Sequence, residues 1–167
     1  MYIIDTNIFI TPYRNYYPFG FGLEFWNFLV KKAEEGEVCS IDKVFDELKD
    51  SDDELYKWAR TSFHKYFKSC DNQSVIETYR EIIKWVDSQS QYKPEAKNEF
   101  MLYSNADAWI IAYAKANGLK VVTLENLNKN IKKNVPIPNV CEAFQIDCLN
   151  IYDFLKITGF KFCEENN

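Results

Sequence analysis

The sequence predicts an α/β fold in which a mainly parallel sheet is surrounded by helices. Short apolar runs with strand character alternate with longer runs whose apolar residues recur at helical spacing. Strands that are separated by helices pair in parallel, because the helix carries the chain back across the sheet. The chain has 167 residues, 47% of them hydrophobic, which suits one domain with a substantial core.

The first predicted strand covers residues 1–5 and ends on an aspartate. A long loop rich in aromatic residues is expected around residues 11–18. Pro12 and Pro18 bracket this segment, and helix is disfavoured there because a proline restricts the residue before it to extended backbone.

A helix and a second strand follow this loop. Apolar side chains at helical spacing predict a helix over residues 23–35, which Gly36 should end. Residues 38–41 form the second expected strand. Asp42 is expected to act as the N-cap of the next helix, because its carboxylate can accept a hydrogen bond from a free backbone N–H.

The middle of the chain, residues 51–103, is expected to be mostly helical and to form a lid or arm. Helices are predicted over residues 53–67 and 74–89, and the second carries an apolar stripe with a period of about 3.6 residues. We expect this helical insertion to belong to a single domain at residues 1–160, followed by a C-terminal tail at residues 161–167.

The last third returns to alternating helices and strands. A helix is predicted over residues 105–117, where Gly118 supplies the stop. Strands are predicted at residues 120–124 and 145–149, and a closing helix at residues 151–157.

Composition excludes several classes of protein. The formal net charge of −5 argues against a general polyanion-binding surface, since such binding depends on clustered Lys and Arg. Any nucleic acid must therefore be bound through local basic patches and metal. Five cysteines without a CxxC pair, beside a single histidine, favour free thiols in a reducing cytosol over a disulfide framework or a zinc site. No secretory leader or membrane-spanning run is recognisable, so we expect a soluble, cytoplasmic protein without membrane contact.

Four carboxylates recur where the predicted strands end or helices begin: Asp5, Glu47, Asp107 and Glu125. In an open parallel sheet, functional groups gather at the carboxyl ends of the strands, so these acids are expected to converge. Carboxylates in one crevice repel each other unless they hold a cation, and their hard oxygens suit Mg²⁺ or Mn²⁺. Asp147, inside the last predicted strand, fits better as an edge or structural acid.

Each of the four acids also has an ordinary structural explanation. Asp5 opens a sequence that favours turns, and Glu47 could pair on a surface with Lys43 one helical turn earlier. Asp107 could complete a capping box, although it shares a helix face with apolar residues, and Glu125 could be a polar loop residue. The order of the four signals along the chain is harder to obtain by chance than any one of them.

Other segments could bind RNA or a partner. Lys129, Lys132 and Lys133 form the best local basic patch, or else a solvated loop face. The aromatic residues at 13–19 could stack on unpaired bases, but packing against a neighbouring element or a partner protein is favoured. His64 is expected on the flank of a helix and is not needed as a general base.

Four motifs together resemble the PIN-domain nucleases, over residues 1 to about 157. The motifs are Ile3-Ile4-Asp5-Thr6-Asn7, Phe45-Asp46-Glu47-Leu48, Ala106-Asp107-Ala108-Trp109-Ile110-Ile111-Ala112 and Val121-Val122-Thr123-Leu124-Glu125. Residues 136–141 and 147–150 also resemble a subgroup of small prokaryotic PIN-like proteins, some of which resemble toxins of toxin–antitoxin pairs. The resemblance implies a three-layer α/β/α sandwich whose acids bind one or two Mg²⁺ or Mn²⁺ ions to cleave RNA.

The resemblance assigns the site residue by residue. Asp5, Glu47 and Asp107 match the three principal acids of the family. At the fourth position many members have Asp two residues after Thr, whereas this chain has Glu125 after Thr123, so a second metal is expected to bind weakly or not at all.

The expected mechanism is hydrolysis at a metal held by Asp5 and Asp107, with a second ion near Glu47 or Glu125. The products implied by the resemblance carry 5′-phosphate and 3′-hydroxyl ends. Three polar residues that adjoin the acids are expected to orient the carboxylates or a metal-bound water: Thr6, Asn7 and Thr123.

We therefore expect a metal-dependent endoribonuclease that acts as the toxin of a toxin–antitoxin pair, with RNA, a cognate antitoxin and a second copy in a homodimer as partners. One alternative is a catalytically weak or inactive PIN-like binding module that acts through a protein partner. A third class, the aspartyl-phosphate phosphatases, also begins with a strand and an aspartate. That chemistry usually needs a second Asp two residues later, where this chain has Asn7.

Overall fold

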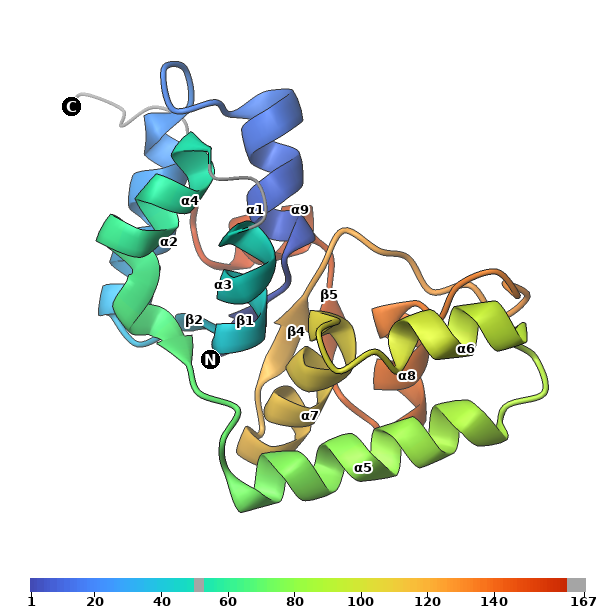
Figure 1. The fold of residues 1–167 in the computed structure, drawn as a ribbon. Helices are drawn as coiled ribbons and strands as arrows, with labels where there is room; N and C mark the ends of the chain where they lie inside the picture. The colour runs from blue at the N-terminus through green and yellow to red at the C-terminus, as the bar shows by residue number, and fades with distance from the viewer. Residues whose placement is uncertain (50–52, 162–167) are drawn as a thin grey trace.

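The structure, a computed structural model, describes residues 1–49 and 53–161 and confirms the predicted fold class. Across this part of the chain, five parallel strands form a sheet in the order β3-β2-β1-β4-β5, with helices on both faces as in a three-layer α/β/α sandwich (Figure 1). The strands are β1 (Tyr2–Ile4), β2 (Val38–Ile41), β3 (Phe67–Lys68), β4 (Lys120–Val122) and β5 (Cys148–Leu149).

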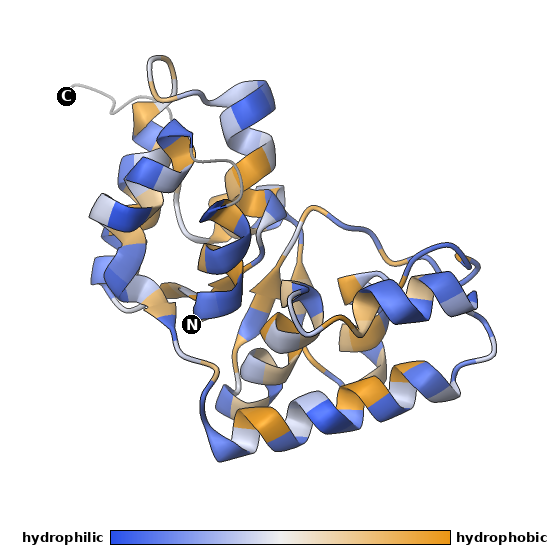
Figure 2. Cartoon of the chain, viewed as in Figure 1, coloured by the Kyte–Doolittle hydropathy of each residue, from blue (hydrophilic) through white to orange (hydrophobic). Residues whose placement is uncertain are grey.

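One face of the sheet is covered by α7 (Ala106–Asn117), which contacts β1, β2 and β4. Helix α5 (Gln73–Ser88) packs along α7 on its outer side, and α8 (Ile137–Ala143) packs against α7 and β5. Between Ala106 and Ala114, every residue of α7 except Asp107 and Tyr113 is apolar and buried, whereas α5 carries alternating apolar and polar bands (Figure 2). Such banding is typical of a helix with one buried and one exposed face.

The other face is covered by α2 (Leu23–Glu34) and α9 (Ile151–Ile157). The rings of Tyr2 from β1 and Phe28 from α2 both contact the ring of Phe154 in α9, with centroids 5.3 and 6.4 Å away. Aromatic packing of this kind contributes about 0.5–1.5 kcal/mol per pair beyond the burial of area.

The remaining helices surround the carboxyl edge of the sheet and the β3 side. They are α1 (Asn7–Thr11), α3 (Asp42–Lys49), α4 (Glu54–Trp58) and α6 (Pro94–Phe100), with π-helical turns at Pro12–Tyr16 and Ala59–Phe63 and a 3₁₀ turn at His64–Tyr66. No helix in the described ranges is both long and apolar enough to cross a membrane.

Strands β1 and β4 lie side by side at the point where the topology reverses. On one side of β1 the sheet continues with β2 and then β3, and on the other side it continues with β4 and then β5. Ile4 pairs with Val122, so the residues that follow these strands, Asp5 and Thr123, emerge next to one another. A reversal of this kind leaves a crevice at the carboxyl ends of the strands, where open parallel sheets bind their ligands.

The prediction of a loop around residues 11–18 was wrong. α1 runs into the π-helical turn, and the backbone N–H of Tyr17 donates to the carbonyl of Pro12 at 2.6 Å. Pro12 lies where α1 joins this turn, and its φ of −57° and ψ of −45° are helical values that the proline ring allows, so the chain stays helical across it.

Two further local predictions were wrong. Asp42 is the first residue of α3 and caps nothing, because its Oδ2 accepts a hydrogen bond from Cys70 N at 3.1 Å. The strand expected at residues 145–149 is only Cys148–Leu149, since Gln145 has a φ of 57° and forms the turn that ends α8.

The segment predicted as a helical arm does more than cover the sheet. Besides α4, α5 and α6 it contributes β3, which pairs with β2 through Ser40 and Phe67. Residues 50–52, and the tail from 162 onward, lie outside the described residues.

Candidate functional site

Asp5 lies at the centre of the carboxyl edge and is almost completely buried, with 2% of its surface exposed. Its Oδ2 accepts a hydrogen bond from the Thr123 hydroxyl at 2.8 Å. Burial raises the pKa of the Asp5 carboxyl from 3.8 to about 7, against the opposing effect of the Thr123 hydrogen bond, and repulsion from Glu125 and Glu47 adds to the rise. The carboxylate is therefore costly to ionise unless a positive charge lies beside it.

Asp107 is the second residue of α7 and faces the same crevice. The N-cap is Asn105, whose Oδ1 accepts from Asp107 N at 2.8 Å, so the capping-box explanation of the Asp107 side chain is wrong. Within residues 1–49 and 53–161, no group donates a hydrogen bond to its carboxylate. Burial raises the pKa of Asp107 well above its ordinary value, and four nearby acids raise it further: Asp5, Glu125, Glu47 and Glu99.

Glu47 reaches the crevice from α3, and both of its oxygens accept hydrogen bonds. Oε1 accepts from the backbone N–H of Ala106 at 2.8 Å, and Oε2 accepts from the Thr6 hydroxyl. Ala106 is the first residue of α7, so Glu47 satisfies a free N–H at a helix N-terminus, where negative charge is favourable. The alternative of a surface pair with Lys43 is wrong, since the Lys43 ammonium lies 4.2 Å from the centroid of the Tyr103 ring.

Glu125 follows β4 by three residues and is held by the segment before α8. Its Oε2 accepts from Ile137 N at 2.7 Å, and its own backbone N–H donates to the Thr123 hydroxyl at 3.1 Å. Burial raises the pKa of the Glu125 carboxyl, although the Ile137 hydrogen bond opposes this. Glu125 is therefore more than a solvated loop residue.

Three polar residues connect the acids, as the sequence predicts. Thr6 donates to Glu47, and Thr123 donates to Asp5. Asn7 Nδ2 donates to Thr123 Oγ1 at 3.2 Å, while Asn7 Oδ1 accepts from the backbone N–H of Leu124 at 3.0 Å. Since the Thr123 hydroxyl also accepts from Asn7 and from the Glu125 N–H, this network fixes the orientation of the Asp5 carboxylate.

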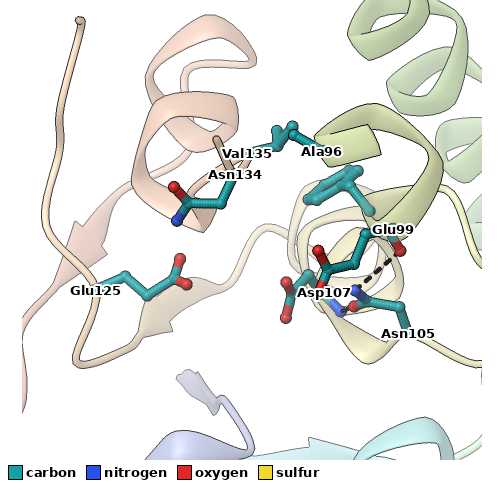
Figure 3. Close-up of a pocket in the computed structure, with 8 residues that line it drawn as sticks. Ala96, Glu99, Asn105, Asp107, Glu125, Asn134 and Val135 are labelled. Atoms are coloured by element: carbon teal, nitrogen blue, oxygen red, sulfur yellow. Dashed lines mark hydrogen bonds between the residues drawn. The ribbon is translucent and has the colours of Figure 1, made fainter. Parts of the chain in front are cut away.

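A cavity of about 200 Å³ opens beside these acids (Figure 3). Glu125 and Asp107 point toward each other across it, and the carboxamide of Asn134 points into it. Glu99, from α6, lies next to Asp107. The sequence analysis missed Glu99 and Asn134. Pro94 at the start of a short helix, followed by buried Ala96 and Phe100 four residues apart, is the sequence signal that could have located Glu99.

Comparison with known proteins gives a family. A family model described as Domain of unknown function (DUF4411) matches residues 2–162 of the chain. The chain belongs to this DUF4411 family. Neither the curated proteins nor the solved structures contain a significant match.

Among the residues that the structure describes, no lysine or arginine forms an ion pair with the acids of this site in the DUF4411 chain. The ion pairs of residues 1–49 and 53–161 join other acids to Lys32, Lys49, Lys120 and Lys129, and none includes Asp5, Glu47, Asp107, Glu125 or Glu99. A hard divalent cation fits this donor set, because the available ligand atoms are all oxygens and their charge is unbalanced. Among the described residues, no three His, Cys, Asp or Glu side chains are close enough together to share one ion as they stand. Mg²⁺ is usually held by one or two carboxylates and several waters, so Asp5 and Asp107 would suffice.

Several other predicted residues lie outside the site of the DUF4411 chain. Asp147 precedes β5 at the opposite edge of the sheet and pairs with Lys120 at 2.9 Å, as expected for a structural acid. Lys129 pairs with Glu142 at 2.9 Å. The other two lysines of the predicted basic patch, Lys132 and Lys133, are both exposed. The His64 ring packs edge-on against Phe45, with centroids 4.9 Å apart.

The aromatic segment of the DUF4411 chain packs mainly against neighbouring elements. The Phe19 ring lies 4.8 Å from that of Trp26, and the Tyr17 ring 5.2 Å from that of Phe25. The carbonyl of Tyr17 also accepts a hydrogen bond from Trp26 Nε1 at 2.7 Å. Tyr16, with 56% of its surface exposed, is the member of this segment that projects furthest into solvent.

Proposed function

We propose that this DUF4411 chain is a Mg²⁺- or Mn²⁺-dependent endoribonuclease that hydrolyses phosphodiester bonds of RNA. The observation that carries the proposal is the pair of desolvated carboxylates, Asp5 and Asp107, which no lysine or arginine of the described residues neutralises. Desolvated acids without a neutralising partner are unfavourable at the switch point of a parallel sheet unless a ligand binds there, and a divalent cation is the ligand that suits their oxygens.

Asp5 and Asp107 would hold the ion, with the second oxygen of Glu125 available beside them. Once bound, a divalent ion supplies a water of lowered pKa and neutralises charge on a phosphate. The chain's own residues position these groups. Thr123 and Asn7 fix the Asp5 carboxylate, and Glu47 fixes the N-terminus of α7 from which Asp107 projects.

The choice of RNA, and of a toxin paired with an antitoxin, is supported by the resemblance of the four acid-bearing motifs to the PIN-domain nucleases. An antitoxin protein and a second copy of the chain are the partners that we propose on the same resemblance.

The test measures the rate at which the protein cleaves a single-stranded RNA that carries a fluorophore and a quencher, in a buffer that contains Mn²⁺. We expect Asp5→Asn and Asp107→Asn each to lower the rate by at least about 10²-fold, the scale of losing one preorganised electrostatic group. Asp147→Asn, which changes an exposed acid at the opposite edge, should keep full activity. Metal-independent cleavage, or undiminished cleavage by both site variants, would contradict the proposal.

A binding module without catalysis is the second candidate. It is favoured by the hydrogen bonds that already occupy both oxygens of Glu47 and one oxygen of Glu125. If expression of the chain arrests growth, this candidate predicts equal arrest by wild type and Asp5→Asn, whereas a nuclease predicts that Asp5→Asn relieves the arrest.

A further inference from the structure

Helix α6 brings a fifth carboxylate to the site, at a position that none of the four motifs includes. Glu99 lies in the cavity beside Asp107, and its negative charge is one of those that raise the pKa of Asp107, after burial and the other three acids (Figure 3). Glu99 is itself solvent-exposed on one side. Its side chain can therefore change rotamer without disturbing the core, unlike that of Asp5.

The position of α6 is fixed at both ends by contacts to the site. At its C-terminal end the carbonyl of Glu99 accepts from Asn105 Nδ2 at 3.3 Å, and Asn105 caps α7 next to Asp107. At its N-terminal end Lys93 N donates to the carbonyl of Lys132 at 2.9 Å, which ties α6 to the loop after Glu125. Glu99 is thus held at the rim of the acid cavity by the same elements that carry Asp107 and Glu125.

The hydrogen-bond pattern separates two kinds of acid in this site. Each oxygen of Glu47 accepts one hydrogen bond, from the Ala106 N–H and from the Thr6 hydroxyl, so this carboxylate is already held against the start of α7 and keeps only one lone pair on each oxygen. Among the described residues, the Asp107 and Glu99 carboxylates accept no hydrogen bond from any side chain or backbone N–H. Asp107 and Glu99 therefore keep all of their lone pairs for a cation, whereas the helix N-terminus sets the orientation of Glu47.

From this difference we propose that Glu99, together with Asp107, binds the divalent cation directly or through a bound water, and that Glu47 is a positioning residue that sets the start of α7. The inference rests on the proposed metal-dependent function. It reassigns the role that the resemblance gives to Glu47 and adds a ligand from the inserted helical segment. Asn134, which points into the same cavity, completes the polar rim opposite Glu99.

The test is a calorimetric titration of the full chain with Mn²⁺ alone, without RNA. We expect Glu99→Gln to raise the Kd by roughly tenfold or more, the scale of losing even an outer contact to a metal ligand, with an unchanged Tm in EDTA. Glu95→Gln is the matched control, because Glu95 is exposed one turn earlier on α6 and outside the cavity, and it should leave the Kd unchanged. Glu47→Gln should lower the Tm in EDTA by several degrees and change the Kd little.

The variants separate the failure of this inference from the failure of the proposed function. An unchanged Kd for Glu99→Gln, beside a strongly raised Kd for Asp107→Asn, would overturn the role of Glu99 and leave the metal site intact. An unchanged Kd for Asp107→Asn would overturn the metal site itself. Glu99→Asp, which keeps the charge but shortens the side chain, should give a Kd between those of the wild type and Glu99→Gln.

Discussion

Replacement of Asp5 by asparagine should stabilise the protein at alkaline pH when no divalent cation is present. The folded-state pKa of Asp5 is raised from 3.8 to about 7. The folded protein therefore binds this proton more tightly than the unfolded chain does, so stability is greatest below pH 3.8 and is lost as pH rises toward about 7. Asparagine removes the ionisation and with it this loss.

The magnitude follows from the two pKa values. A difference of about three pKa units at 1.36 kcal/mol each makes the ionised carboxylate cost roughly 4 kcal/mol at pH 8, and less than about 1 kcal/mol at pH 4. Asparagine offers only one acceptor in place of two oxygens, and Asp5 accepts from both Thr123 and the backbone of Thr6. The unmade hydrogen bond costs about 1–3 kcal/mol, which leaves a net gain of at least about 1 kcal/mol at pH 8.

The assay is urea denaturation of wild type and Asp5→Asn in EDTA at pH 4.5 and pH 8. We expect the variant to be the more stable protein at pH 8 and to lose that advantage at pH 4.5. Asp147→Asn is the control, because Asp147 is exposed and its pair with Lys120 is worth less than about 1 kcal/mol at either pH. Equal or lower stability of Asp5→Asn at pH 8, or a gain that does not change with pH, would refute the reasoning.

Three further predictions concern the same network. Mn²⁺ affinity should fall as pH is lowered below about 7, because protons compete for the Asp5 carboxylate, and calorimetry at pH 5.5 and 7.5 measures this. Thr123→Val removes the hydrogen bond that favours ionised Asp5, so it should weaken Mn²⁺ binding at pH 7 more than at pH 8.5; equal weakening at both pH values would contradict this cause. Asn105→Ala should cost about 1 kcal/mol in urea denaturation, the typical value of an N-cap, and a cost near zero would show that Asn105 does not cap α7.

The acids at the strand ends could be located from the sequence because a parallel sheet has only one carboxyl edge. Asp5 and Glu125 follow apolar runs that can only be strands, and Asp107 begins a helix that is apolar on nearly every side. What the sequence could not give is that β4 pairs directly with β1, which places Thr123 against Asp5. That pairing depends on how all five strands pack, and no local pattern encodes it.

The predictions of strands and site residues from the sequence were incomplete where tertiary contacts override the local preference of the chain. β3 and β5 have two residues each, too few to show any alternation, and they exist because β2 and β4 offer unpaired edges. α6 has seven residues and would be unstable alone, so the packing of its buried residues and the hydrogen bond from its N-cap residue Lys93 to Lys132 decide where Glu99 lies. A residue placed by such contacts cannot be recognised as part of a site until the chain is folded.

The central claim is that separated acids share a divalent cation, and the anomalous scattering of Mn²⁺ soaked into crystals of the chain tests it most directly. We predict an anomalous peak in the crevice between Asp5 and Asp107, which disappears in crystals of Asp107→Asn. Absence of a peak there at saturating Mn²⁺, or peaks confined to exposed acids such as Asp147, would contradict the account.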